Sequence, residues 1–469
     1  MSDSSPLKEK LESLREQPDR LIEIILRQAG VIEEQRQKIE DLQKQIQHLN
    51  DRNNGLSGRL EQLERAAARP AAPFRIKESK RQVDPKKAGR KKDHPGSCRP
   101  IPDHVDEEIV VPLHSCPDCG RRVEQLRSVV QYIEEIPPVR PRIIKLVTQC
   151  GDCSGCGKEV RSTHPLQVSL AEGAAGVQLG PNAVGTAIEL SRKHGLTMRK
   201  TCAVLSQLFQ LKLSPGGLAQ AMARMAGKLE PAYENLLARL RDGPLVHSDE
   251  TSWWVGGPGH WLWVFADKTS TAYRVAPGRG RNIVLETLGD GYGGTLVSDC
   301  LAVYDDVNAR QQKCYSHHLK AISRAMEESP SPYLSEVKAL LKAAMALKGA
   351  DLPEPQWKER RRALEEQAQL LLSTPRPGLE EKVRKRLWKQ RDHLFTFLDH
   401  PEVDATNNLA ERQLRPAVIA RKVSCGNKTQ SGARTWEILA SLAATCGQRA
   451  ESFAKLVSQA AGLNYSFSR

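Results

Sequence analysis

Residues 244–255 read PLVHSDETSWWV, and residues 293–306 read GGTLVSDCLAVYDD. Each segment has a short apolar run that leads into an aspartate, Asp249 in the first and Asp299 in the second. Runs of this length and composition predict buried β-strands. An acid at the end of such a strand projects where the strand meets solvent. Both aspartates are therefore candidates for one polar site at the edge of a sheet.

The chain between these segments predicts the rest of the sheet. HWLWVFADK (260–268) and TAYRVAP (271–277) have strand-like composition, and RNIVLETLG (281–289) is typical of a helix. QKCYSHH (312–318) predicts a further short strand. Three strands, a helix and a strand that ends in an acid follow the order of an RNase H-like fold. In that fold, adjacent central strands bring acids that are distant in sequence to one edge.

A third acid, Glu411, lies in DATNNLAERQLRP (404–416), where two interpretations compete. In the first, Asn408 caps a helix and Glu411 reaches back to close a capping box. In the second, Glu411 joins Asp249 and Asp299 as a metal ligand, because a helix that follows a long insertion can return to the same edge.

Three acids of this kind suit two divalent ions. Two Mg²⁺ or Mn²⁺ ions about 4 Å apart need bridging carboxylates, and they activate the attacking oxygen and stabilise the leaving oxygen. Spacing alone is weak support, since an aspartate at a strand end is more often a turn or cap residue.

The N-terminal region carries a heptad pattern over residues 21–64. Its a positions are Ile25, Ile32, Ile39, Ile46, Asn53 and Leu60, and its d positions are Gln28, Gln35, Leu42, Leu49, Leu56 and Leu63. Isoleucine at a with leucine at d favours a parallel two-stranded coil. The alternative is one amphipathic helix that packs on its own domain.

Residues 65–99 hold twelve Lys and Arg against three acids, among many Ala and Pro. This composition predicts a flexible basic linker that makes salt-sensitive contact with phosphates. Its GRKK segment, with Arg90, Lys91 and Lys92, could enter a minor groove as a short arm. A solvated charge run is the more common explanation.

Five of the eleven cysteines lie between residues 116 and 156. CPDCG supplies Cys116 and Cys119, and CGDCSGCGK supplies Cys153 and Cys156, with strand-like residues (129–149) between them. Two CxxC motifs joined by strands predict a structural zinc ribbon with these four cysteines as ligands. Cys150 is a spare or an alternative ligand.

Residues 171–243 look helical, and the stretch from Leu196 to Leu229 has the spacing of a helix-turn-helix or of an ordinary helical scaffold. Residues 318–400 are charged and helical, and the last seventy residues are helical again. The net charge of +14 predicts an anionic partner, most simply nucleic acid. The chain lacks an apolar run of about 18 residues and its start lacks a signal-peptide core, so we expect a cytoplasmic protein.

Several segments together resemble the transposases of the insertion sequence 66 family: HSDETSWWVGG, APGRG, SDCLAVY, CYSHHLKAISR and TNNLAERQLRPAVIARK. GRRV and CGKEVRSTHPLQVS also look like parts of that family's zinc-binding and helical modules. The resemblance covers nearly the whole chain. It departs from the family at Cys300, where glycine is more usual, and at Ser316, where alanine is usual.

The resemblance implies that Asp249, Asp299 and Glu411 form the catalytic triad of a DDE-type enzyme. It also implies an accessory Cys-x-x-His pair, Cys314 and His317, which is either a packed structural pair or a metal or substrate site. The basic residues that flank the glutamate would hold phosphates of the end DNA; these are Arg412, Arg415, Arg421 and Lys422.

These features predict a multidomain α+β protein. It comprises a coiled coil (1–64), a basic linker (65–99), a zinc ribbon (100–170), a helical DNA-binding domain (171–243), and an RNase H-like α/β catalytic core (244–317 and 401–469) with a helical insertion (318–400). The expected function is a DNA transposase that binds the ends of its own element as a dimer or larger assembly, with accessory proteins of that element. It would cleave 3′ ends with Mg²⁺ or Mn²⁺ and join them to target DNA. The alternatives are a catalytically silent DNA-binding derivative and an RNase H-like nuclease or resolvase.

Overall fold

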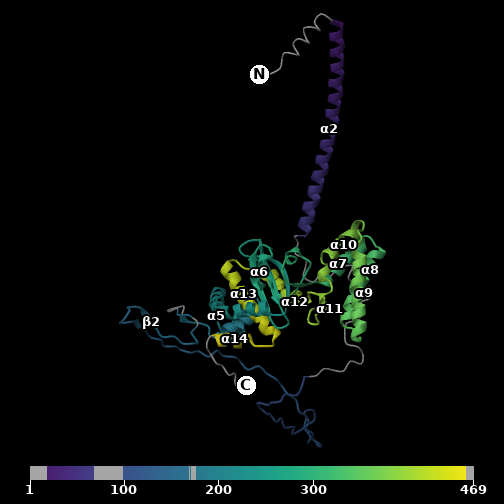
Figure 1. Cartoon of the computed structure of the whole chain (residues 1–469). Helices are drawn as coiled ribbons and strands as arrows, with labels where there is room; N and C mark the ends of the chain where they lie inside the picture. Colours follow the sequence, from purple (N-terminus) through teal and green to yellow (C-terminus); the bar gives the residue numbers. More distant parts are fainter. Residues whose placement is uncertain (1–17, 68–98, 168, 171–175, 461–469) are drawn as a thin grey trace. The chain divides into compact units, whose positions relative to one another are not determined.

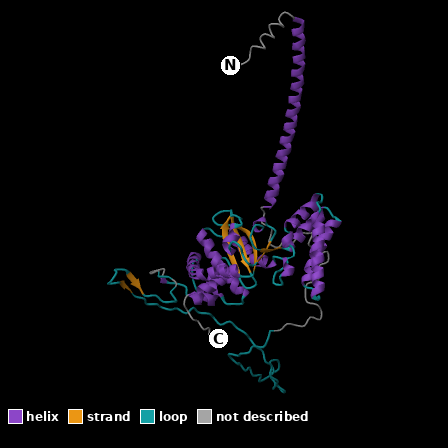
Figure 2. Ribbon diagram, viewed as in Figure 1, coloured by secondary structure: helices purple, strands orange, loops and turns teal. Residues whose placement is uncertain are grey.

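The computed structural model describes residues 18–67, 99–167, 169–170 and 176–460. The chain divides into two units, Met1–Ile133 and Glu134–Arg469. The second unit combines helices with a mixed five-stranded sheet (Figures 1 and 2). The prediction of a mixed α+β protein is therefore confirmed. Within the described residues, none of the helices is both long and apolar enough to cross a membrane.

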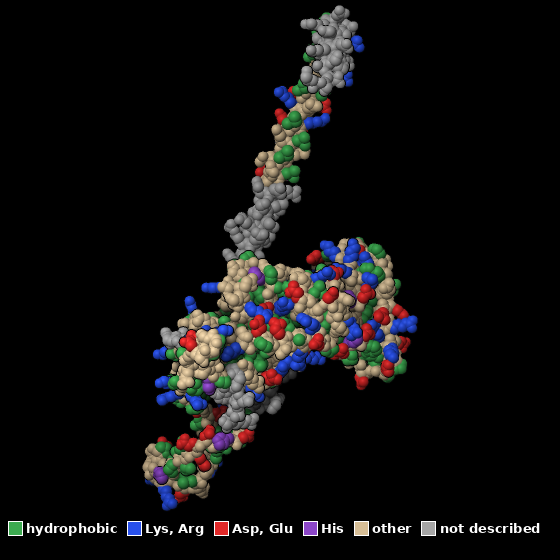
Figure 3. Space-filling view, turned by 60° about the vertical axis from the view of Figure 1, so that its left-hand side comes forward, with side chains coloured by type: hydrophobic (Ala, Val, Ile, Leu, Met, Phe, Trp, Pro, Cys, Tyr) green, Lys and Arg blue, Asp and Glu red, His purple; other side chains and the backbone are tan. Residues whose placement is uncertain are grey.

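The described part of the first unit contains one long helix, α2 (Pro18–Ala67), as the heptad predicts. Proline suits the first turn of a helix because its missing N–H would be unpaired there in any case. The apolar a and d side chains along its described part stay more than half exposed, from Ile25 at 58% to Leu49 at 59%. Figure 3 shows these hydrophobic side chains along the helix surface. An apolar stripe that remains exposed along one helix is typical of a surface that pairs with another chain.

Each CxxC motif forms a tight turn of its own. In the first unit, the backbone N–H of Gly120 donates to the carbonyl of Cys116. In the second unit, Gly157 makes the same bond to Cys153, between the short antiparallel strands β1 (Cys150–Asp152) and β2 (Glu159–Arg161). Backbone N–H groups and the second cysteine lower the pKa of the Cys116 and Cys153 thiols. Both turns thus favour the thiolate form that a metal needs, and the shared zinc site remains a prediction.

The prediction of strands over residues 129–149 is wrong. This segment is irregular, and most of its apolar side chains are exposed. Pro137, Pro138 and Pro141 explain the result, because proline cannot donate to a ladder and is confined to strand edges and ends.

Four helical segments lead into the sheet: α3 (Pro181–Ile188), the π-helical turn η3 (Glu189–Lys193), α4 (Met198–Phe209) and α5 (Pro215–Asp242). The side chains of Thr197 and Ser214 cap α4 and α5. One side of α5 is buried along most of its length, and Tyr233 donates to the carbonyl of Tyr273 in the sheet. Such packing is expected of α5 if this region is an ordinary helical scaffold. Contact between this region and DNA remains a prediction.

The sheet has the order β5-β4-β3-β6-β7. Its strands are β3 (Leu245–Trp253), β4 (His260–Ala266), β5 (Thr271–Pro277), β6 (Thr295–Ser298) and β7 (Arg310–Lys313), with α6 (Asn282–Leu288) before β6 and the short 3₁₀ turn η4 (Ala302–Tyr304) after it. The first three pair antiparallel, and β6 and β7 add parallel to β3. The predicted strands and helix are thus present. The last predicted strand is too long: β7 ends at Lys313, and Tyr315 already begins a helix.

Both faces of the sheet are covered by helices (Figure 2). Along β4, Trp263 and Phe265 enter the core that contains α5 and α6, whereas Leu262 and Val264 enter the core on the other face. Two helices cover that other face, α12 (Asn408–Ser424) and α13 (Gln430–Gln448), and α14 (Phe453–Ala460) packs on α3. The alternation of the side chains along β4 therefore builds three layers.

The segment between β7 and α12 is helical, as predicted. It comprises α7 (Tyr315–Glu328), α8 (Pro332–Lys348), α9 (Glu354–Ser373), α10 (Gly378–Lys389), the 3₁₀ turn η5 (Arg391–His393) and α11 (Thr396–Asp399). These helices share a core that also includes Leu245 and Val297 of the sheet. The Phe397 N–H donates to the side chain of Gln312, which ties the end of this helical segment to β7.

Candidate functional site

Two of the predicted acids lie side by side in the sheet. Asp299 directly follows β6, as expected, but the expectation that Asp249 ends its strand is wrong, because Asp249 lies in the middle of β3. Strands β3 and β6 are parallel, with His247 beside Val297. Asp249 and Asp299 each lie two residues after this pair, so the register also places the two aspartates next to each other. Their carboxylate oxygens approach within 4.8 Å of each other. The register of β3 and β6 thus brings the two sequence motifs together.

A third carboxylate, Glu250, joins this cluster and was missed by the sequence reasoning. It follows Asp249 in β3 and therefore faces the other side of the sheet, yet its oxygen lies within 4.8 Å of both aspartates. Tyr304 donates to Glu250 over 2.6 Å, and Arg279 of the APGRG segment donates to it over 2.5 Å. Two features of the sequence could have indicated Glu250: it directly follows a predicted catalytic acid, and an arginine lies in the glycine-rich APGRG segment.

The electrostatics of the cluster favour a cation. Burial, helped by repulsion from Glu250, Asp299 and Glu411, raises the pKa of Asp249 to about 7. The Glu250 N–H, which donates to the Asp249 carboxylate over 2.9 Å, opposes this shift. Like charges this close resist ionisation, and a divalent ion would relieve that repulsion.

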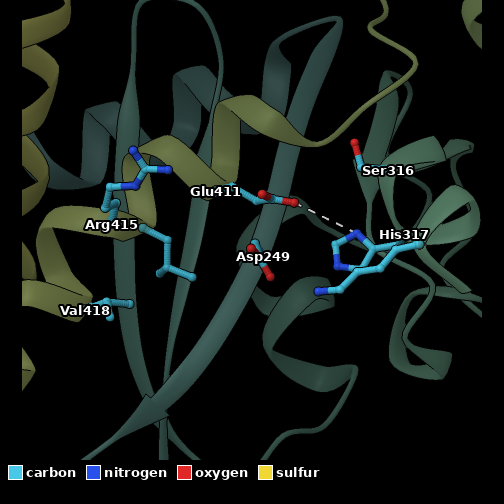
Figure 4. Close-up of a pocket in the computed structure, with 8 residues that line it drawn as sticks. Asp249, Ser316, His317, Glu411, Arg415 and Val418 are labelled. Atoms are coloured by element: carbon cyan, nitrogen blue, oxygen red, sulfur yellow. Dashed lines mark ion pairs between the residues drawn. The ribbon is translucent and has the colours of Figure 1, made fainter. Parts of the chain in front are cut away.

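Glu411 sits in the first turn of α12, and the capping-box interpretation is wrong. The N-cap is Asn407 rather than Asn408, and the side chain of Asn407 is bonded elsewhere. The Glu411 carboxylate instead lies 3.9 Å from Nδ1 of His317 (Figure 4). It therefore points away from its own helix start and into the space that it shares with Asp249.

Asn407 is a second residue that the sequence reasoning missed. It is fully buried; its Nδ2 donates to the carbonyl of Ser248 over 2.7 Å, and its Oδ1 lies 3.2 Å from Nδ1 of His247. Its backbone N–H donates to Sγ of Cys314. Asn407 thus ties the start of α12 to β3 and to the residue before α7, and so it positions Glu411.

The predicted Cys314 and His317 pair also lies at the site. Cys314 caps α7, and His317 is in its first turn. Although burial opposes it, contact with His317 and the Asn407 N–H lower the pKa of the Cys314 thiol. Contact with Cys314 in turn raises the pKa of His317. The Cys314, His317 and Glu411 ligand atoms lie within 4.8 Å of one another, so the structure brings Glu411 to this pair.

Three of these residues, Asp249, His317 and Glu411, share one open pocket of about 460 Å³. It is lined by Asp249, Ser316, His317, Lys320, Glu411, Leu414, Arg415 and Val418. Figure 4 shows Asp249 and Glu411 extending into it from β3 and α12, with His317 opposite. A pocket lined by two acids and two cations suits a phosphate-containing substrate whose charge a metal ion neutralises.

The predicted DNA-binding residues differ in their surroundings. Arg412, Arg415 and Lys422 are exposed on α12. Arg421 instead donates to the hydroxyls of Thr251 and Ser252, so it fixes the end of α12 to β3. Arg90, Lys91 and Lys92 lie outside the described residues. Lys320 of α7 is an exposed cation at the pocket that the sequence reasoning did not select.

Comparison with known proteins identifies the family of the chain. Residues 176–435, which contain the sheet, the acids and the whole helical segment, match the family described as Transposase IS66 family. Because this match covers more than half of the chain, the protein belongs to the IS66 family of transposases. An uncharacterized protein, y4qI of Sinorhizobium fredii (strain NBRC 101917 / NGR234), is 25% identical over 274 residues. The chain spans about half the length of this curated relative.

Proposed function

We propose that the protein is a DNA transposase that binds the ends of its own insertion sequence, cleaves their 3′ ends and joins them to target DNA. Two observations support the proposal: the carboxylates of Asp249 and Asp299 approach within 4.8 Å of each other, and Asp249 and Glu411 line one pocket together with Lys320 and Arg415. The strand order, with three antiparallel strands followed by two parallel ones, supports an RNase H-like core.

The donor set fits Mg²⁺ or Mn²⁺. Asp249 and Asp299 offer oxygen ligands close together, Glu411 adds a third from the pocket wall, and hard divalent cations prefer such oxygens. When bound, these ions would make the attacking oxygen more nucleophilic and stabilise the leaving one. Glu250, held by Tyr304 and Arg279, stiffens β3 beside Asp249.

The protein's own side chains would orient the DNA. Lys320 and Arg415 flank the acids, and they would hold the phosphates next to the cleaved bond. Arg412 and Lys422 extend this contact along α12, and the basic linker adds salt-dependent affinity. The four cysteines Cys116, Cys119, Cys153 and Cys156 would hold a structural Zn²⁺, and α2 would pair two chains.

The test is a cleavage and strand-transfer assay with end DNA of the element and Mg²⁺. Asp249→Asn, Asp299→Asn and Glu411→Gln should each reduce cleavage by at least about 10³-fold, because each removes a charge that binds metal. Their affinity for end DNA should stay within about threefold. Arg362→Gln, on the exposed surface of α9 in an ion pair with Glu366, is the control and should cleave normally.

Two outcomes would contradict the proposal. A wild-type protein that binds end DNA but never cuts it with Mg²⁺ or Mn²⁺ would be a silent DNA-binding derivative. A protein that nicks DNA without forming joined products would be a nuclease or resolvase. An acid variant that retains cleavage would remove that residue from the triad.

A further inference from the structure

Three side chains with mixed donor atoms meet beside the acid cluster. They are the thiol of Cys314, the imidazole of His317 and the carboxylate of Glu411, and their ligand atoms all lie within 4.8 Å of one another. They come from two helix starts that are about ninety residues apart in sequence, so their meeting is a product of the fold.

The sulfur is fixed where it can act as a ligand. Cys314 follows β7, and its N–H donates to the carbonyl of Ser298. Its side chain is fully buried, and Sγ accepts the backbone N–H of Asn407 over 3.2 Å. His317 returns over it in the first turn of α7, where its N–H donates to the Cys314 carbonyl.

The imidazole has an unsatisfied ring nitrogen. Nδ1 of His317 is buried and lacks a hydrogen-bond partner among the described residues, and it lies 3.9 Å from Oε1 of Glu411. A buried polar atom without a partner is costly, and such groups need an explanation. An ion between the imidazole, the carboxylate and the thiolate would satisfy all three.

The chemistry of the donors selects the ion. Sulfur, nitrogen and one carboxylate oxygen suit Zn²⁺, whereas Mg²⁺ prefers oxygen alone. Bond lengths of about 2.0–2.3 Å place neighbouring ligands of tetrahedral zinc roughly 3.3–3.7 Å apart. The His317 and Glu411 atoms need to approach by only a few tenths of an ångström, and both side chains are partly exposed, at 37% and 42%. His317 and Glu411 also line the open pocket, from which a further ligand could reach such an ion.

We propose that Cys314, His317 and Glu411 form a second site that binds one Zn²⁺ ion with an open coordination position. It is distinct from the four-cysteine zinc site, and it shares Glu411 with the proposed hard-cation site, whose other ligands are Asp249 and Asp299. The inference goes beyond the proposed function, because it concerns ion binding by these three side chains and does not depend on DNA cleavage.

The test uses Co²⁺ as a spectroscopic substitute in the full-length chain. The protein is dialysed against Co²⁺, and the spectrum of Cys314→Ser is subtracted from that of the wild type. The difference should contain a thiolate-to-cobalt charge-transfer band, and metal analysis should show one ion fewer per chain. His317→Ala should lose the same ion, which provides a second variant if the serine protein folds poorly. Near-ultraviolet circular dichroism checks the fold of each.

Two control variants separate this site from its neighbours. Cys300→Ser removes a different partly buried thiol, which contacts His318, and it should keep the ion. Asp249→Asn should keep it as well, although we expect that variant to lose cleavage. The proposal is overturned if folded Cys314→Ser and His317→Ala bind as many ions as the wild type, or if Asp249→Asn loses this ion. Either result is independent of whether the wild-type protein cleaves end DNA.

Discussion

The charge of Asp249, which the proposed metal site needs, should lower the stability of the metal-free protein. Burial and three neighbouring carboxylates raise its pKa to about 7, well above the value of about 3.9 for an unfolded aspartate. The folded protein therefore binds more protons than the unfolded chain between these values. Without metal, it should lose stability as the pH rises from about 4 to about 7.

Asp249→Asn should remove this penalty. We expect the metal-free variant to gain about 1–2 kcal/mol in free energy of unfolding at pH 8, since one pKa unit is worth about 1.4 kcal/mol and the carboxyl is partly exposed. The gain should shrink towards pH 4. Urea unfolding at both pH values in Mg²⁺-free buffer measures it. A variant less stable than the wild type at pH 8 would contradict this account.

The Asn407 side chain, in contrast, should stabilise the fold, because its hydrogen bonds connect the start of α12 to β3. Asn407→Ala should lower the free energy of unfolding by about 2–3 kcal/mol, since it leaves the Ser248 carbonyl and the His247 ring without partners in a buried place. Cleavage should fall too, because Glu411 loses its support. The neighbouring exposed residue supplies the control: Asn408→Ala should change stability by less than about 0.5 kcal/mol. Equal effects of the two substitutions would refute this role.

At the scale of elements, α2 carries an exposed apolar stripe. Ile32 and Ile39 are 56% and 55% exposed along its apolar stripe. If two chains pair through this stripe, Ile32→Lys with Ile39→Lys should convert a dimer into a monomer, which light scattering after size exclusion detects. Gln37→Lys, at the outward f position of the same heptad, should leave the dimer intact. A double variant that remains dimeric would place the interface elsewhere.

The elements also show what a sequence can predict. The strands β3 and β6 follow from local apolar runs, and the run of β6 also places Asp299 directly after its strand. The polar residues after Asp249 hid the fact that β3 continues to Trp253. The helix that carries Glu411 was also anticipated. Its cap was not, because the Asn407 side chain prefers distant partners on β3 to its own helix. Glu250 was missed for a similar reason, since its partners Tyr304 and Arg279 are tertiary.

At the scale of the molecule, one buried network joins the sheet to the helical segment. Lys313 of β7 is fully buried, and its ammonium lies 3.1 Å from Asp305. The same carboxylate accepts from Lys389 of α10 and from Gln390. A helix that is more than seventy residues away in sequence is thereby attached to the edge strand behind Asp299.

Asp305→Asn should therefore be strongly destabilising, by about 3–5 kcal/mol, because it leaves a buried ammonium without a counter-charge. Adding Lys313→Met should recover a large part of that loss, since it removes the unpaired charge. Chemical unfolding of the two variants measures both steps. If the double variant is no more stable than the single variant, loss of the ion pair does not explain the destabilisation by Asp305→Asn.

The two ends of the helical segment meet at the site. The Tyr315 N–H donates to the carbonyl of Ala405, and the chain therefore leaves the sheet and returns to it at almost the same point. The closure entropy of a loop grows only slowly with its length, and here the closing bond lies beside His317 and Asn407. The segment can accordingly lengthen, shorten or exchange its outer helices without displacing the carboxylate of Glu411. This geometry would allow a transposase to acquire new contacts with DNA or with a partner protein while its reaction centre stays unchanged.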